Sequence, residues 1–328
     1  MTSSPKLIRE TSIAQDILWV DGISGTAKSM LFPILSSFQR VEVQRLEHIY
    51  EYLCILHHFG KIETDAAIPL MRIYADLAVH DNMISRETNF RPGDDSSVFN
   101  TPNSLTYLKR LFHKDGPAVL ERIRQQKPIL HVMTHQVLGV SDLAFRSYGE
   151  RLKILVMIRH PLRVMPHWVD ANWGERYGTD PKDVTLWLDH KGKALPWWAR
   201  GWEEEYVKLS PIGRVVRSID SLIRRMNNFY DNLSSDRKEK VLIVPFEQFA
   251  SNPYPWMDRI ETLLKTHRGP QTARMMKKQN VPRVLDDSDL GFLRDKYMTA
   301  IPEPEIRDLL DTMSQEYETR YGLSTESL

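Results

Sequence analysis

The stretch Ile17–Ser29, ILWVDGISGTAKS, decides the predicted fold. Ile17–Val20 is a short apolar run, typical of a strand that is buried on both faces, and a helical pattern over Ser29–Phe38 follows the turn directly. A glycine-bearing turn between a strand and a helix leaves backbone N–H groups pointing at one spot, which also lies at the positive end of the helix dipole. The stretch therefore predicts a loop that cradles phosphate.

Within this loop, Gly22 and the pair Lys28-Ser29 have the spacing of the Walker A motif, G-x-x-x-x-G-K-[ST], with Ala27 in place of the second glycine. Such a degenerate string also occurs by chance, and an ordinary structural turn is the alternative. Its place between a buried strand and a helix favours phosphate binding. The residues that we expect to hold the phosphate groups are Gly22, Ser24, Gly25, Thr26, Ala27, Lys28 and Ser29.

Three more apolar runs resemble buried strands, and stretches of helical period separate them. The runs are Ile129–Met133, Ile154–Ile158 and Val241–Val244. Alternation of buried strands with helices predicts an α/β protein, a P-loop-type three-layer fold with a central parallel sheet and helical insertions. We find no linker, so residues 1–328 are expected to form one domain, with insertions near 81–103 and 168–202 and a closing helix at Ile306–Tyr321.

Composition limits the functional classes. The 328 residues are 41% hydrophobic and 27% charged with a net charge of +1, which excludes a mainly disordered chain and offers no global field for nucleic acid. Cys54 is the only cysteine, so no intrachain disulfide is possible. The first 16 residues lack the apolar core of a signal peptide, and no run of 18 apolar residues occurs. We expect a soluble, cytoplasmic protein that does not insert stably into membranes.

Ligands of parallel α/β sheets bind beyond the carboxyl ends of the strands, so the residues that follow each strand are the candidates for chemistry. His135 follows the second run and has the proton affinity of a base near neutral pH, whereas His131 lies inside that run and is expected to be structural. Arg159 follows the third run as a fixed cation for phosphate, with a surface ion pair as its alternative, and His167 lies on the next helix.

The two insertions are candidates for a substrate pocket. The polar loop near 81–103 contains Arg86 and Arg91, and the stretch 168–202 holds six of the eight tryptophans, Trp197 and Trp198 among them. Indole faces suit sugar rings and flat acceptors, so these four residues are expected to line an acceptor site. The alternative, weighted equally, is that the tryptophans form the core of an inserted helical layer and that the arginines are solvated.

Taken in order along the chain, these motifs resemble the sulfotransferases that use 3'-phosphoadenosine 5'-phosphosulfate (PAPS). That family has a Ser-Gly-Thr loop after the first strand, a Thr-His strand end, an Arg-x-Pro strand end, and later a Tyr-Glu-Asp-Leu…Asp-Pro segment. The corresponding residues here are Ser24-Gly25-Thr26, Thr134-His135, Arg159-His160-Pro161, and Phe246-Glu247-Gln248-Phe249 followed by Asn252-Pro253.

The resemblance implies sulfuryl transfer from PAPS, which leaves as PAP, to a hydroxyl or amine of a small-molecule or glycan-like acceptor. It implies that His135 is the general base and that Lys28 assists the leaving phosphate. Arg159 and His167 would then hold the 3'-phosphate. The chain departs from the family at Ile23, where a basic residue is usual, and at His167, where a serine is usual. A basic segment near the C-terminus is not evident, and its only candidates are Arg274, Lys277, Lys278 and Arg283.

Two other classes stay open. A P-loop kinase for small molecules would share the loop, but it needs Mg²⁺ held by Ser29 and by an acid at a strand end, where only Glu247 is available. We therefore expect no metal. A non-catalytic nucleotide-binding protein is the second alternative, because Ile23 and Ala27 both depart from loop templates.

Overall fold

The computed structural model describes residues 5–286 and 288–322. Within these ranges, five parallel strands form the main sheet in the order β2-β3-β1-β4-β7. The strands are β1 (Asp16–Asp21), β2 (Arg45–Leu46), β3 (Ile129–Met133), β4 (Leu152–Ile158) and β7 (Val241–Pro245). All four strands expected from the sequence are present, and the predicted α/β class with a central parallel sheet is confirmed.

Helices cover both faces of this sheet. Apolar side chains alternate along each strand between the two faces, so each face needs a covering layer that forms a core with it. Ile17 and Trp19 of β1 face one core, and Leu18 and Val20 face the other. The first core is covered by α2 (Ile49–His58), α3 (Thr64–Asn82), α5 (Pro117–Gln126) and α6 (Asp142–Tyr148), and the second by α1 (Lys28–Leu35), α11 (Phe246–Ser251), α12 (Pro253–Leu264) and α13 (Thr272–Lys278). The predicted three layers are therefore present.

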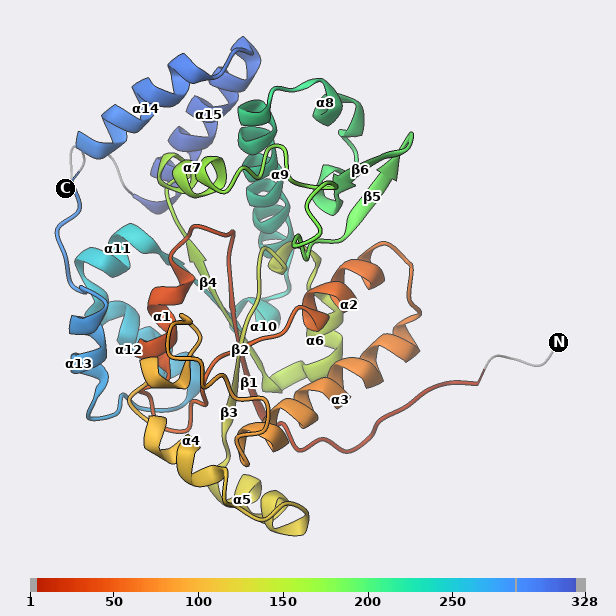
Figure 1. The fold of residues 1–328 in the computed structure, drawn as a ribbon, viewed down its shortest axis with the longest axis vertical. Helices are drawn as coiled ribbons and strands as arrows, with labels where there is room; N and C mark the ends of the chain where they lie inside the picture. Colours follow the sequence, from red (N-terminus) through yellow and green to blue (C-terminus); the bar gives the residue numbers. More distant parts are fainter. Residues whose placement is uncertain (1–4, 287, 323–328) are drawn as a thin grey trace.

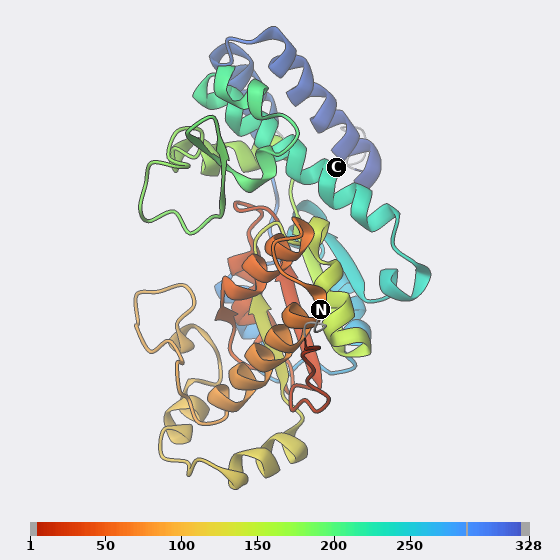
Figure 2. The ribbon, with the colours of Figure 1, turned by 90° about the vertical axis from the view of Figure 1, so that its right-hand side faces the viewer.

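A helical body lies beyond the carboxyl ends of the strands, at the top of Figures 1 and 2. It consists of α7 (Pro161–Asp170), α8 (Glu203–Lys208), α9 (Pro211–Asp231), α14 (Ser288–Ala300) and α15 (Pro304–Tyr321), with the hairpin of β5 (Trp187–His190) and β6 (Lys193–Pro196). The helix α15 corresponds to the closing helix expected from the sequence. Because this body covers the strand ends, a ligand bound there would lie between it and the sheet.

The remaining elements are short. They are α4 (Ser104–Arg110), α10 (Ser235–Lys238) and four turns of 3-10 helix, η1 (Val98–Asn100), η2 (Leu138–Val140), η3 (Gly149–Arg151) and η4 (Trp197–Ala199). Both α4 and α5 lie at the end of the molecule opposite the helical body (Figure 1). None of the helices in the described ranges has the length and hydropathy needed to cross a membrane.

Candidate functional site

The loop between β1 and α1 leaves the sheet by a path that only glycine can take. Gly22 has a φ of +143°, and a Cβ at this position would lie 2.2 Å from the carbonyl oxygen of Met157 in β4. The Thr26 hydroxyl donates to the carbonyl of Ile23 at 2.8 Å, and Ala27 has a left-handed φ of 67°. These constraints hold the loop in a tight curve directly before the first turn of α1.

This curve presents backbone donors that are not used within the protein. The first hydrogen bond of α1 runs from Met30 N–H to the Ala27 carbonyl. In the described part of the chain, no acceptor is found for five backbone N–H groups of the loop and first helical turn, those of Ser24, Gly25, Ala27, Lys28 and Ser29. Convergent N–H groups before a helix form an anion site, so the loop has the geometry of a phosphate cradle.

Lys28 adds a buried cation to the cradle. Its ammonium donates to the carbonyls of Gly22 and Ile23, and its side chain is only 5% exposed. Burial lowers the pKa of Lys28 to about 8, although Asp21 and Glu51 act in the opposite direction. A bound oxyanion would favour the charged form, so Lys28 can supply the positive charge that Ile23 does not.

The residues that follow β4 support the same loop from the other side. Arg159 donates to the Gly25 carbonyl at 3.0 Å, lies 4.4 Å over the Phe246 ring, and has a buried Nε that finds no acceptor in the described chain. His167 packs so closely that a Cβ on Gly25 would lie 3.0 Å from the His167 Cβ. Arg159 and His167 are therefore both beside the cradle. Partial burial lowers the pKa of His167, and repulsion from Lys28 and Arg159 lowers it further by smaller amounts.

The turn after β3 is fixed to the end of β1 by Asp21. This buried carboxylate accepts from the Thr134 hydroxyl at 2.9 Å and from the backbone N–H groups of Val137 and Leu138. In addition, the Gln136 N–H donates to the Gly22 carbonyl at 3.1 Å. The turn that contains His135 is thus joined directly to the phosphate cradle.

His135 is oriented by a glutamate on α2. Glu51 Oε1 lies 3.0 Å from both the backbone nitrogen and the Nδ1 of His135. A neutral imidazole that donates from Nδ1 keeps Nε2 as its proton acceptor. Burial and the nearby Lys28 lower the pKa of His135 despite the opposing Glu51, so the ring is held in its basic form at neutral pH.

Glu51 also contacts a second histidine. The Nδ1 of His48 lies 3.5 Å from Glu51 Oε2, and the His48 and His135 rings stack at 5.9 Å. Burial acts to raise the pKa of Glu51, but the hydrogen bonds from the two histidines outweigh it and keep this pKa below its ordinary value. The three groups offer ligand atoms within 4.8 Å of one another, as a metal site would. The two histidines already provide hydrogen bonds to the Glu51 carboxylate, which favours a role in proton transfer over metal binding.

A hollow of about 860 Å³ lies at the ends of β4 and β7. Its lining includes His160, Arg163, Glu247, Arg283 and Arg294. Arg283 lies 5.2 Å over the Phe246 ring that also carries Arg159, so the hollow adjoins the Arg159 end of the site. Of the four basic residues that the sequence offered for the C-terminal part of a nucleotide site, only Arg283 lines this hollow. Lys278 instead donates to Asn100, and Arg274 and Lys277 are exposed on α13.

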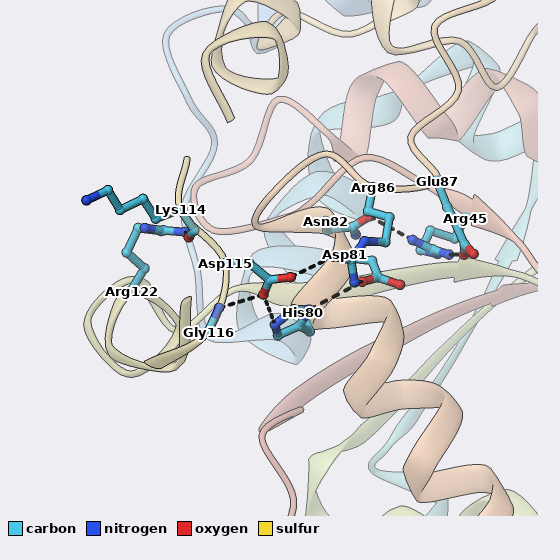
Figure 3. A network of polar contacts seen from close by, with 10 residues as sticks. All are labelled: Arg45, His80, Asp81, Asn82, Arg86, Glu87, Lys114, Asp115, Gly116 and Arg122. Atoms are coloured by element: carbon cyan, nitrogen blue, oxygen red, sulfur yellow. Dashed lines mark hydrogen bonds and ion pairs between the residues drawn. The ribbon is translucent and has the colours of Figure 1, made fainter. Parts of the chain in front are cut away.

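Arg86 and Arg91 both form ion pairs with acidic residues of the protein. Figure 3 shows the ion pairs of Arg86 with Asp81 and Asp115, whose N···O distances are 3.3 Å and 2.6 Å. Arg91 has an 80% exposed side chain and pairs with Asp94. The loop packs against Phe32 of α1, and its Glu87 pairs with Arg45 of β2. The alternative interpretation, solvated arginines with surface ion pairs, describes both residues.

Trp197 and Trp198 are core residues. Their exposed fractions are 2% and 0%, and both belong to the core that includes α9. Their rings contact each other edge to face at 5.8 Å. Because neither ring is available to a ligand, the acceptor-wall hypothesis does not fit them, and the alternative of an inserted layer with a tryptophan core does.

Three solved structures show what this chain is similar to. The sulfotransferase domain from the curacin biosynthetic pathway is 10% identical, with a TM-score of 0.49 over 93% of this chain and 98% of its own. The sulfotransferase domain of the Synechococcus PCC 7002 olefin synthase is 11% identical, with a TM-score of 0.43 over 94% and 96%. The sulfotransferase from Alicyclobacillus acidocaldarius is 14% identical, with a TM-score of 0.38 over 92% and 96%. No protein-family profile and no curated protein matches the chain.

The fold and the site together define an α/β protein with a strand–loop–helix turn that has the geometry of an anion site, and a histidine–glutamate pair at the next strand end. At the identities and scores given above, the likeness does not assign an activity. The function is therefore proposed from this chain's own residues.

Glu51 and His48 are the members of the site that sequence reasoning missed. Both lie in the stretch Leu46–Phe59, whose apolar residues recur at helical spacing and predict a helix, a pattern that assigns no role to the polar positions. Glu51 is 8% exposed at a helix start, and a carboxylate between Tyr50 and Leu53 was the only available signal.

Proposed function

We propose that this protein is a PAPS-dependent sulfotransferase. The observation that carries the proposal is the junction of the phosphate cradle with the His135–Glu51 pair at neighbouring strand ends. The cradle offers unpaired N–H groups and the Lys28 ammonium, and the turn beside it offers an oriented imidazole. An anion site joined to a base suits transfer of an anionic group to an acceptor that must lose a proton.

In this proposal, each part of the donor has its own contacts. The loop N–H groups and the Ser29 hydroxyl hold the 5'-phosphosulfate, and Thr26 fixes the shape of the loop through its hydrogen bond to the Ile23 carbonyl. Arg159 and His167 hold the 3'-phosphate, because both flank the loop and Arg159 retains an unused buried Nε. The hollow that contains Arg283 takes the adenosine part. No metal is required, since backbone donors and Lys28 cover the charge.

The reaction proceeds by in-line displacement at sulfur. The acceptor oxygen or nitrogen forms a bond to sulfur while the bond between sulfur and the bridging phosphate oxygen breaks. His135 Nε2 takes the acceptor proton, and Glu51 stabilises the imidazolium that results. The Lys28 ammonium stabilises the negative charge that develops on the leaving phosphate oxygen of PAP.

The acceptor is proposed to be a small molecule or glycan-like compound with a hydroxyl or amine. The base lies at the start of an aromatic row in which His48 stacks on His135 and Tyr52 stacks on His48 at 6.1 Å. Tyr52 also donates to the Val184 carbonyl, where Val184 and Trp187 expose apolar surface. These residues, rather than Trp197 and Trp198, are the candidates for acceptor contacts. Action in the cytoplasm, with no nucleic-acid partner, remains part of the proposal.

The kinase alternative is disfavoured because the described carboxylates at the strand ends and beside His135 already have protein donors. Asp21 already accepts from three donors, and Glu51 is shared by two histidines. Glu247 accepts from the Tyr317 hydroxyl at 2.7 Å and from the His160 N–H at 3.0 Å. A carboxylate that is already saturated by protein donors is a poor Mg²⁺ ligand.

Calorimetric titration tests the proposal. PAP and PAPS should bind without Mg²⁺, whereas ATP should bind weakly and gain little from Mg²⁺. PAPS-to-PAP conversion with an acceptor library should then identify turnover. Tight, Mg²⁺-dependent ATP binding would identify a kinase instead, and PAP binding without turnover of any acceptor would support the non-catalytic alternative.

A further inference from the structure

The outer face of α9 carries a row of hydrogen-bond donors that the proposed reaction does not use. The opposite face of this helix is buried, with Val215, Ile219 and Leu222 in the main core. The outer residues recur at helical spacing and share one side, and they are Arg217, Ser221, Arg224, Arg225, Asn228 and Asn232. Such a concentration of arginine and amide groups on one helix face is more than solubility requires.

These residues line a groove of about 810 Å³ that η2 and α10 complete. At one end, Gly139 of η2 lies so close to α9 that a Cβ there would be 2.8 Å from the Arg225 side chain. At the other end, Arg237 of α10 contributes a fourth guanidinium. No carboxylate lines the groove in the described part of the chain.

Carboxylates outside the groove pair with three of its four arginines. The ion pairs are Arg217–Asp220 at 2.8 Å, Arg224–Asp220 at 2.6 Å and Arg237–Asp142 at 2.9 Å. Asp220 is 3% exposed and shared by two arginines. Further carboxylates contact Arg217 and Arg224 from neighbouring elements, so these pairs fix the guanidinium groups in place at the groove wall.

Arg225 has no carboxylate partner among the described residues. Its guanidinium lies 5.3 Å over the Trp197 ring, its NH1 is 3.4 Å from the Nε2 of His58, and its Nε is buried without an acceptor. Arg200 is nearby, over the Phe59 ring at 4.8 Å, and also lacks an acidic partner in the described ranges. Burial and repulsion by Arg200 lower the pKa of Arg225. An oxyanion in the groove would relieve this repulsion.

We propose that the α9 groove is a binding site for a ligand that carries at least two oxyanions, either phosphates or carboxylates. The fixed guanidinium groups match the planar geometry of such anions, and the asparagine and serine side chains add neutral donors. The volume exceeds what a single anion needs, so a multiply charged ligand fits it best. This site is separate from the phosphate cradle and does not depend on the proposed sulfuryl transfer.

Calorimetry with pyrophosphate tests the site. Because pyrophosphate also suits the cradle, the wild type is compared with Lys28→Gln, which weakens the cradle, and with Arg225→Gln, which weakens the groove. We expect Lys28→Gln to bind pyrophosphate in the groove as the wild type does. In Arg225→Gln, the affinity of the groove for pyrophosphate should fall by about tenfold or more. Exposed Arg124 on α5 gives the matched control, and Arg124→Gln should bind as the wild type does.

A second variant guards against misfolding of Arg225→Gln, whose side chain packs on Trp197. Asn228→Asp adds a carboxylate at an exposed groove position and should also weaken pyrophosphate, with an unchanged melting temperature. Repeating the titrations with tricarballylate separates a carboxylate ligand from a phosphate ligand. Wild-type pyrophosphate and tricarballylate binding in both Asn228→Asp and folded Arg225→Gln would overturn the proposal.

Discussion

Two strand ends of this protein pair a histidine with a glutamate, and they differ in what the imidazole has left to offer. At the end of β3, only one ring nitrogen of His135, Nδ1, contacts Glu51. At the end of β4, His160 is 1% exposed, lies 3.1 Å from Glu318 through Nε2, and accepts from the Leu162 N–H through Nδ1. A histidine with both nitrogens in use is a structural residue, whereas one with a free nitrogen can transfer a proton.

Removing His135 should separate the two histidines most clearly. We expect His135→Ala to lower kcat by about 10²–10⁴-fold, the usual contribution of a general base, with PAP affinity nearly unchanged. Steady-state kinetics and calorimetry measure the two quantities. Turnover near the wild-type value would remove His135 from the mechanism and make both strand ends structural.

The Arg159 side chain tests the donor end of the site. Arg159→Ala should weaken PAP by roughly 10–150-fold, the equivalent of about 1.5–3 kcal/mol for a charge-assisted contact. Adenosine 5'-phosphate should be affected far less, because only PAP carries the 3'-phosphate. Equal weakening of the two ligands in calorimetry would show that Arg159 does not contact that phosphate.

The Glu51 carboxylate should matter through the base that it orients. We expect Glu51→Gln to lower kcat by about 10–100-fold, less than loss of His135 itself, because the ring remains but its imidazolium is no longer stabilised. The kinetic pKa of the base should also fall, since Glu51 acts to raise it. A pH profile of kcat distinguishes this from a purely structural effect, which would leave the profile in place.

Lys28 predicts a pH limit on donor binding. Its pKa of about 8 in the free protein means that the ammonium is charged below this pH and loses its proton above it. PAP affinity should therefore decrease severalfold between about pH 7 and pH 9. In Lys28→Gln this decrease should vanish, and its persistence would assign the titration to another group.

Substitution of His160 should change stability rather than turnover, and we expect this effect to be the smallest of those predicted here. Burial lowers its pKa, so the folded protein binds this proton less readily than the unfolded chain does. Stability is therefore full above the unfolded pKa, about 6.5, and declines as the pH falls below it. His160→Gln should flatten that decline and lower the melting temperature by about 2–4 °C, without changing kcat of the folded enzyme. A large loss of kcat would contradict the structural role.

Local patterns predicted four of the five strands of the main sheet, but not β2 or the β5–β6 hairpin. They also predicted the loop and the residues that follow the strands, because parallel strands place their carboxyl ends at one edge. The Glu51–His135 contact joins residues 84 positions apart, and no local pattern encodes it. The tryptophans were compatible with either burial or a binding wall, and only packing decides between them. Arg86 was assigned by loop chemistry, whereas its position depends on Asp115, which lies in a different segment.

Asp21 has a consequence for redesign of this protein. It ends β1 directly before Gly22 and, through Thr134, Val137 and Leu138, fastens the turn that bears the base. In the proposed reaction, one carboxylate would therefore set the distance between the donor's reactive end and the proton acceptor, rather than two independently adjustable loops. Grafting this site onto another scaffold would therefore require that both turns and Asp21 be transferred together.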